Sequence, residues 1–281
     1  MAVNVRWRFG LLCTVSLILG ACAVTEVVPL QRKIALLAPF EGRYREVGYE
    51  ALYAIHLALA DSDSENVALL AVDDGGTPDM ARLRARALVA DSQVYGVLVL
   101  GYAATDPAVL AAFDDLPVLV TGIWGVDADE ANIFVLASAE ILDLLTVSPS
   151  TPITTLAASG EAVTGAEALA LNEFAWLRDD LSDVTVVSSG RLPGVAFRER
   201  ILVDNPFASE PALLSTLSYD AARLMIDAVQ GAEDRTAVRE TIATREFSGL
   251  NGPIRFEDGY WQDAPVNYYQ YNADRVLYVV P

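Results

Sequence analysis

From Lys33 onward, short apolar segments alternate with segments in which apolar residues recur every three or four positions. Strands that are buried on both faces read as continuous apolar runs, and the helices between them show helical periodicity. This alternation predicts an α/β fold with parallel strands and right-handed helical crossovers. The first lobe is expected to be Rossmann-like, with strands at Ile34–Ala38, Val67–Val72, Val94–Leu100 and Leu116–Thr121 and helices at Glu46–Ala60, Pro78–Ala90 and Pro107–Phe113.

The pattern is less regular after Gly122. Val195–Ser209 shows no clear periodicity, whereas Ser218–Gln230 carries a strong apolar stripe typical of an amphipathic helix. The other expected helices are Val163–Arg178 and Thr236–Ala243, and the expected strands are Ile133–Ala137, Ile153–Ala158, Val184–Ser188, Ile254–Phe256, Val266–Tyr271 and Val276–Val280.

The N-terminus has the pattern of a secretory signal. Arg6 and Arg8 precede an apolar run from Phe9 to Leu19, which is shorter than the roughly 20 apolar residues of a transmembrane helix. The run ends in Leu-Gly-Ala-Cys22, which resembles the bacterial lipobox, a motif whose cysteine is lipidated. We therefore expect a lipoprotein signal peptide at 1–21, a lipid-carrying Cys22, a tether at 22–32 and a location on the outer side of the cell membrane, periplasm or cell surface. The alternative is an ordinary signal peptide in which Cys22 is incidental.

Charge and composition exclude several classes of function. The formal net charge of −19 argues against a nucleic-acid partner, since phosphate binding requires a concentration of Lys and Arg. Two cysteines and one histidine leave little scope for a zinc site or a Ser-His-Asp triad. The sequence contains no nucleotide-binding or nucleophile-elbow motif, so we expect no catalytic residues, no metal and no cofactor.

Three motifs carry a resemblance to a known family. They are the segment 34–48, the acidic turn 73–78, and, near the C-terminus, Tyr219-Asp220-Ala221 followed by Gly252-Pro253-Ile254-Arg255-Phe256. In this order they resemble the type I periplasmic binding proteins, in the branch that binds leucine, isoleucine and valine for ABC transporters. The resemblance implies two Rossmann-like lobes joined by a hinge, a small-molecule solute between them, and an ABC permease as partner.

The resemblance also implies ligand-binding residues in the first lobe, at the ends of its strands. The third strand of the family is followed by a Ser/Thr pair, where this chain has Ala103, Ala104 and Thr105; Thr105 is either a ligand hydroxyl or a helix N-cap. The family's fourth strand ends in a small-residue turn that meets the ligand's charged head. Here Trp124 is either an aromatic wall or a packing residue between lobes. The implied set is Tyr44, Tyr102, Ala103, Thr105, Thr121, Gly122 and Trp124.

In the second lobe the implied residues depart from the family pattern. Ser159 and Glu161 follow one expected strand, and Arg191 follows the next, where the family often has an acid. Glu161 is either a replacement for that acid or a solvated carboxylate at a helix start. The pocket for an amino acid is therefore not intact in sequence.

The resemblance implies that 33–125 and 207–264 form the first lobe, and that 126–206 and 265–281 form the second. The second lobe is short by about one strand–helix unit of roughly 30 residues. We therefore expect a non-enzymatic, lipid-anchored solute-binding protein of an ABC importer, which captures a small, polar, amino acid-like ligand by hinge closure. The alternative is a non-transport lipoprotein, a ligand sensor or interaction scaffold, that kept the fold but lost the pocket.

Overall fold

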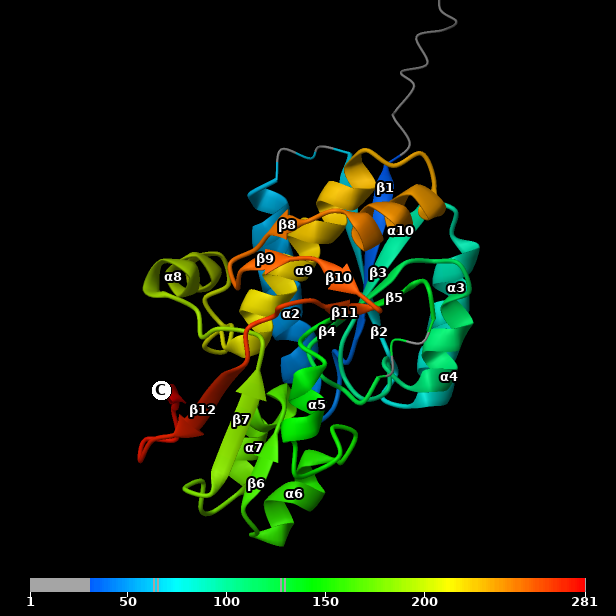
Figure 1. Cartoon of the computed structure of the whole chain (residues 1–281). Coiled ribbons are helices and arrows are strands. Elements are labelled where there is room, and N and C mark those ends of the chain that lie inside the picture. Colours follow the sequence, from blue (N-terminus) through cyan, green and yellow to red (C-terminus); the bar gives the residue numbers. More distant parts are fainter. Residues whose placement is uncertain (1–30, 63, 65, 127, 129, 281) are drawn as a thin grey trace, which may run out of the picture. The chain divides into compact units, whose positions relative to one another are not determined.

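The larger of the two main sheets has seven strands, five of which form the parallel core of the first lobe (Figure 1). The computed structural model describes residues 31–62, 64, 66–126, 128 and 130–280, and the predictions for the signal peptide and Cys22 lie outside them. From edge to edge the order is β10 (Phe256–Glu257), β11 (Tyr260–Trp261), β5 (Ile133–Leu136), β4 (Val118–Thr121), β3 (Val94–Val99), β1 (Arg32–Ala38) and β2 (Val67–Asp73).

Helices cover both faces of this sheet, as the alternating pattern predicts. α2 (Arg45–Ala60) and α9 (Leu213–Gln230) pack together on one face, and α3 (Pro78–Ala90) lies with α4 (Pro107–Leu110) on the other (Figure 1). α4 continues into a short 3₁₀ turn, η1 (Ala111–Phe113), and α10 (Arg235–Thr244) follows α9. The strands and helices predicted between residues 33 and 121 are thus confirmed within two residues at each end.

The strand order fixes where a ligand site is expected. β1 lies between β2 and β3. After β1, the chain therefore adds β2 on one side of β1 and then β3 on its other side. Loops that follow strands on the two sides of such a reversal diverge, and they leave a crevice at the carboxyl ends of the strands. Here the crevice lies between the loop after β1 and the loop after β3.

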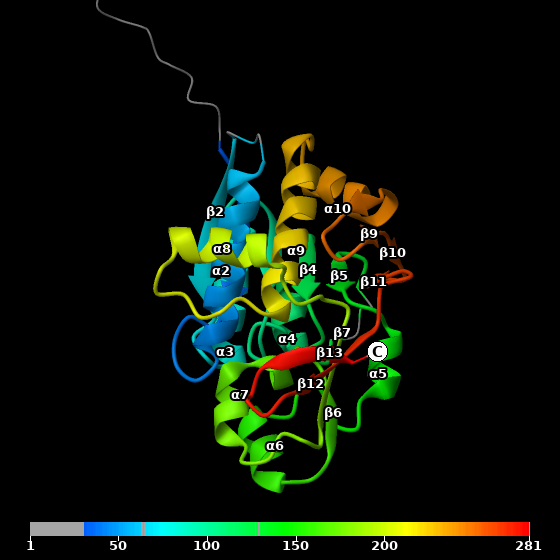
Figure 2. The same ribbon diagram turned by 90° about the vertical axis from the view of Figure 1, so that its left-hand side faces the viewer.

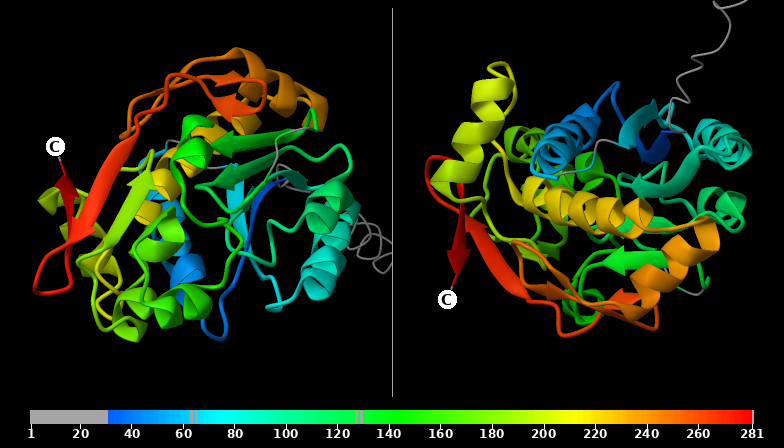
Figure 3. Two further views of the ribbon diagram at one scale, coloured as in Figure 1. Left: turned by 60° about the horizontal axis from the view of Figure 1, so that its bottom comes forward. Right: turned by 90° about the horizontal axis from the view of Figure 1, so that it is seen from above.

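The smaller sheet has four strands, in the order β13 (Leu277–Val280), β12 (Asn267–Tyr271), β7 (Val184–Ser188) and β6 (Val163–Gly165). Only β6 and β7 are parallel, and Figure 3 shows β12 beside β7 with β13 at the edge. The helices around it are α5 (Glu140–Leu144), α6 (Ile153–Ser159), η2 (Glu167–Ala170) and α7 (Asn172–Leu177); a separate hairpin pairs β8 (Phe247–Ser248) with β9 (Pro253–Ile254). We call this sheet with α5–α7 the second lobe, and the larger sheet with its helices the first lobe.

Two predictions for the second lobe are wrong. The segment expected as a strand at 153–158 is α6, which begins after Pro152 and ends at Gly160 with φ +64°. The segment expected as one helix at 163–178 consists of β6, η2 and α7. Short apolar runs do not distinguish a strand from a buried helix by periodicity. Val163–Gly165 is a strand because it pairs with β7.

Three further differences concern the connections between lobes. Val195–Ser209, expected to be irregular, contains the helix α8 (Val195–Asp204), which lies beside α2 (Figure 2). Only Ile201 of α8 is buried, so the helix lacks the apolar stripe that would have revealed it. α9 begins five residues before the predicted start. β5, expected in the second lobe, pairs with β4 in the larger sheet. Among the described residues, no helix is long and apolar enough to cross a membrane.

Candidate functional site

The crevice at the strand reversal holds a cavity of about 370 Å³, which we call the switch-point cavity. Its walls come from the loops after β1, β2 and β3, and Thr154 of α6 closes it from the second lobe. Three residues predicted from the sequence, Tyr44, Tyr102 and Ala103, line it together. The remaining lining residues are Pro39, Glu41, Gly42, Arg43, Asp74 and Gly76.

Tyr44, Tyr102 and Trp124 form a row of edge-to-face aromatic contacts from the cavity into the space between the lobes. The ring centroids of Tyr44 and Tyr102 lie 4.9 Å apart, and those of Tyr102 and Trp124 lie 5.4 Å apart. The Tyr102 hydroxyl donates a hydrogen bond of 3.2 Å to the carbonyl of Thr151 in the second lobe, and burial raises the pKa of this phenol. The row therefore joins the two lobes as well as bounding the cavity.

The other predicted residues of the first lobe lie behind the cavity wall. Trp124 is only 3% exposed, and its indole nitrogen donates to the carbonyl of Thr121 at 2.8 Å, so its packing role is the one the structure supports. Thr105 is buried, and its hydroxyl donates to the carbonyl of Gly101. The N-cap of α4 is Asp106, so the N-cap alternative for Thr105 is wrong. The Thr121 hydroxyl is buried and has no hydrogen-bond partner among the described residues.

The turn after β4 is occupied by a side chain that the sequence analysis missed, Glu167. This fully buried carboxylate accepts a hydrogen bond of 2.9 Å from the amide of Ile123 and one of 2.6 Å from the Ser188 hydroxyl. Gly122 has φ +82°, and a Cβ there would lie 3.1 Å from a Glu167 oxygen. Burial raises the pKa of Glu167. At the turn where the resemblance places a ligand's charged head, the chain presents its own carboxylate.

Glu167 was missed because it was assigned to the face of a long helix. It lies two residues after β6, at the carboxyl end of a strand, which is where site residues gather in α/β folds. The Val-Thr-Gly segment at 163–165 could have indicated a short strand just before Glu167. A second contact between lobes lies nearby, where the amide of Ser138 donates 2.9 Å to the Ser189 hydroxyl.

The predicted residues of the second lobe are not brought to this place. Ser159 ends α6 and Glu161 lies just before β6, so both precede the strand and lie away from its carboxyl end. The Ser159 hydroxyl donates to the carbonyl of Leu156. Arg191 is exposed after β7, and its amide donates 2.7 Å to the side chain of Asn251. None of the three lines the switch-point cavity.

The C-terminal motif holds the connection between lobes in place. The buried Asp220 carboxylate on α9 accepts hydrogen bonds from the amides of Leu250 and Asn251 and from the Asn251 side chain, at 2.6–2.9 Å. Burial raises the pKa of Asp220. Since Asn251 in turn binds the backbone at Arg191, the motif links α9 to the crossover after β7.

The electrostatics of the switch-point cavity are mixed. Asp74 is buried, and desolvation raises its pKa to about 6, although the Gly76 amide stabilises the carboxylate at 2.7 Å. Its neighbour Asp73 accepts hydrogen bonds from the amides of Phe40 and Gly75, and Thr77 caps α3, so the segment 73–78 forms a turn and starts the helix. Within the described residues, no group of three or more His, Cys, Asp or Glu side chains could hold a metal ion.

Solved structures with the same fold include substrate-binding proteins of ABC transporters. The branched-chain amino acid transporter substrate-binding protein LivJ of Streptococcus pneumoniae, in complex with isoleucine, shares 13% identity at a TM-score of 0.68, over 89% of this chain and 99% of that one. The leucine-binding protein LivK of Thermotoga maritima shares 14% identity at a TM-score of 0.71, over 89% and 98%. An R. palustris ABC transporter solute-binding protein in complex with benzoate shares 12% at 0.62, over 89% and 95%.

No protein-family model matches the chain, and no curated protein matches it. At identities of 12–14% the likeness establishes the fold rather than the ligand. The chain therefore has the fold of the type I periplasmic binding proteins, of the kind found in branched-chain amino acid ABC transporters.

Proposed function

We propose that this chain is a solute-binding protein that captures a small, polar, amino acid-like ligand in the switch-point cavity and delivers it to an ABC permease. The observation that carries the proposal is the position of that cavity. It lies at the carboxyl ends of β1, β2 and β3, at the strand reversal, and Thr154 of the other lobe closes it. Ligands of open α/β sheets bind at this place, and two lobes that close on a ligand shield it from water.

The lining supports a ligand that carries both charge and apolar surface. Tyr44 and Tyr102 offer ring faces and edges, and Glu41 and Asp74 offer carboxylates for an ammonium group, whereas Arg43 is paired with Glu173. A volume of about 370 Å³ lies in the range of small-molecule sites.

We also propose that Cys22 carries lipid and holds the protein on the outer face of a cell membrane, where a permease would receive the solute. The lipobox pattern at 19–22 supports this anchor. Two or more acyl chains hold a protein on a bilayer stably, whereas one chain is marginal. Cys22→Ser is expected to release the full chain from membranes into the soluble fraction on ultracentrifugation, and retention of the variant in the pellet would contradict the anchor.

A specific observation favours a second candidate, a lipoprotein that senses or scaffolds and does not transport. The Glu167 carboxylate already satisfies the Ile123 amide at the turn where the resemblance places a ligand's charged head. In that case the side chains of the two lobes would hold them together, and the switch-point cavity would bind no solute.

A thermal-shift panel of amino acids and small metabolites on the full chain separates the two candidates. A ligand at 100 times its dissociation constant adds about 2.7 kcal/mol to stability. The transport proposal predicts a hit whose effect is lost in Tyr44→Ala. The matched control is Tyr95→Ala, because Tyr95 lies on β3 and does not line the switch-point cavity. A panel without any hit would contradict the solute-binding proposal and favour the scaffold.

A further inference from the structure

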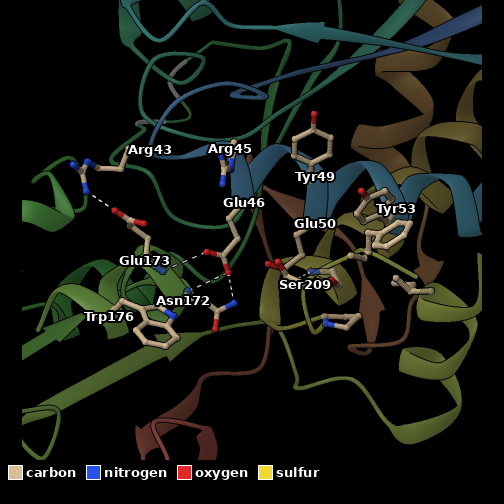
Figure 4. Close-up of a pocket in the computed structure, with 15 residues that line it drawn as sticks. Arg43, Arg45, Glu46, Tyr49, Glu50, Tyr53, Asn172, Glu173, Trp176 and Ser209 are labelled. Atoms are coloured by element: carbon tan, nitrogen blue, oxygen red, sulfur yellow. Dashed lines mark hydrogen bonds and ion pairs between the residues drawn. The ribbon is translucent and has the colours of Figure 1, made fainter. Parts of the chain in front are cut away.

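A second cavity, of about 440 Å³, lies between the first half of α2, α7 and the segment 205–215 (Figure 4). We call it the α2–α7 cavity. It shares only Arg43 with the switch-point cavity, and no strand end contributes to it. The proposed function makes no use of this cavity.

Two carboxylates one helical turn apart project from α2 into this region, toward Asn172 and Ser209 (Figure 4). Glu46 accepts hydrogen bonds from the amide and the side chain of Asn172, at 3.0 and 2.6 Å, and so stabilises the start of α7. Through Oε1, Glu50 accepts the amides of Ala212 and Ser215 and the Ser215 hydroxyl, at 2.7–2.9 Å. No donor among the described residues reaches its Oε2, which leaves that oxygen for a ligand.

Aromatic side chains surround the two acids. Trp176 is 82% exposed and Phe207 is fully exposed, although both line the cavity; Tyr49 and Tyr53 complete the set. In Figure 4 the carboxylates lie between Trp176 on one side and the two tyrosines on the other. Large aromatic side chains left in water at the rim of a concave site indicate a partner that covers them. Aromatic rings combined with carboxylates are the usual surroundings of a bound organic cation.

The charges of the lining favour the same kind of ligand. Arg43 is paired with Glu173, which leaves Arg45 as the remaining guanidinium beside Glu46 and Glu50. Desolvation and the neighbouring Glu46 raise the pKa of Glu50 to about 7. A ligand with positive charge would relieve this unfavourable burial of negative charge, whereas a carboxylate would add to it.

We propose that the α2–α7 cavity is a ligand site for an organic ammonium ion with an apolar body. The ammonium group would contact the free oxygen of Glu50, and the body would lie against Trp176 and Phe207. The volume of about 440 Å³ accommodates an amine of the size of an arylalkylamine. This inference is independent of the proposed function, because the two cavities have different linings.

Calorimetric titration of the full chain with three probes of matched size tests the proposal: phenethylamine as cation, phenylalanine as zwitterion and hydrocinnamate as anion. We expect the amine to bind about tenfold or more tightly than the other two, a difference of about 1.4 kcal/mol. Glu50→Gln keeps an oxygen acceptor for the start of α9 and removes the charge, so it should weaken amine binding about tenfold. No amine binding, or tighter binding of the zwitterion or the anion, would overturn the proposal.

Two further variants keep the test decisive if Glu50→Gln fails to fold. Trp176→Ala removes a side chain that is mostly in solvent, so it should leave the fold intact and weaken amine binding about fivefold or more. Tyr44→Ala removes a side chain that lines the switch-point cavity but not the α2–α7 cavity, so it should leave amine binding unchanged. Amine binding that is lost in Tyr44→Ala and kept in Trp176→Ala would place the amine in the switch-point cavity, which overturns this inference and supports the proposed function.

Discussion

The carboxylate of Glu167 accepts a hydrogen bond of 2.9 Å from the backbone amide of Ile123, and this buried contact joins the two lobes. Glu167 follows β6 in the second lobe, and Ile123 follows β4 in the first. The Ser188 hydroxyl binds the other carboxylate oxygen, so both oxygens are satisfied away from water. The chain thus provides its own carboxyl group at the turn where the resemblance places the charged head of a ligand.

Removal of this carboxylate should loosen the contact between lobes. Glu167→Ala leaves the buried amide of Ile123 and the Ser188 hydroxyl without their partner, and each unsatisfied buried group costs about 1–3 kcal/mol. We expect the free energy of unfolding in urea to fall by about 2–4 kcal/mol. Glu167→Gln keeps an acceptor oxygen and serves as the matched control, with a loss of less than about half of that. An alanine variant as stable as the wild type would show that the contact does not hold the lobes together.

Truncation of Trp124 should lower the free energy of unfolding much more than truncation of Trp176. Trp124 is 3% exposed and packs against Tyr102, so Trp124→Ala is expected to cost about 3–5 kcal/mol. Trp176 is 82% exposed, so Trp176→Ala should change stability by no more than about 0.5 kcal/mol. Chemical denaturation of both variants checks the pair. Equal losses would contradict the assignment of Trp124 to the packed interface.

Glu50 should contribute to the pH dependence of the free energy of unfolding. Its pKa is about 7 in the folded chain, above the ordinary value of 4.5, with Glu46, Glu173 and Arg45 as the charged groups around it. The folded state therefore binds the proton more tightly, so this contribution is complete below pH 4.5 and is lost as the pH rises through 7. It amounts to at most about 3 kcal/mol, and exposure to solvent in the cavity reduces it.

Glu50→Gln removes this titration. Other carboxyl groups with a raised pKa, such as Asp74 and Glu167, are present in both proteins, so their contributions cancel in the comparison. We expect the variant to lose less stability than the wild type between pH 5 and pH 8, by about 1–3 kcal/mol. Unfolding in urea at the two pH values measures the difference. Parallel pH profiles for the two proteins would be evidence against a raised pKa at Glu50.

The Asp220 carboxylate should be essential for the turn at 249–251. It accepts three hydrogen bonds from Leu250 and Asn251, and Asn251 holds the backbone of Arg191. Asp220→Ala should lower the free energy of unfolding by about 3 kcal/mol or more, whereas Asp220→Asn should retain part of it. Hydrogen exchange should also speed up at Leu250 and Asn251 in the alanine variant. Unchanged exchange there would contradict this role.

Most of the first lobe could be predicted from the sequence, because the spacing of its apolar residues identifies its strands and helices. Continuous apolar runs such as Ile34–Ala38 are buried in the centre of the parallel sheet. Gly48 lets α2 pack against the chain after β1, because a Cβ at this position would lie 2.1 Å from the Pro39 carbonyl oxygen. The implied cavity residues Tyr44, Tyr102 and Ala103 do lie together, since they follow neighbouring strands.

The second lobe was predicted poorly for reasons that are local. The run 153–158 satisfies a strand pattern and a helix pattern equally, and the error there led to a second error, the single helix assumed at 163–178. The later strands β7, β12 and β13 were predicted within one residue at each end. The two errors displaced Ser159 and Glu161 to the wrong end of β6 and hid Glu167 inside an assumed helix. Contacts between the lobes, such as those of Glu167 and Ser138, join residues far apart in sequence, and no local pattern carries them.

The most direct test of the account is a crystal structure of the full chain with the strongest ligand from the thermal-shift panel. The account predicts electron density for that ligand between Tyr44, Tyr102 and Thr154, with the Glu167–Ile123 hydrogen bond intact behind it. Ligand density that displaces Glu167 from the turn, or that lies outside the switch-point cavity, would contradict it.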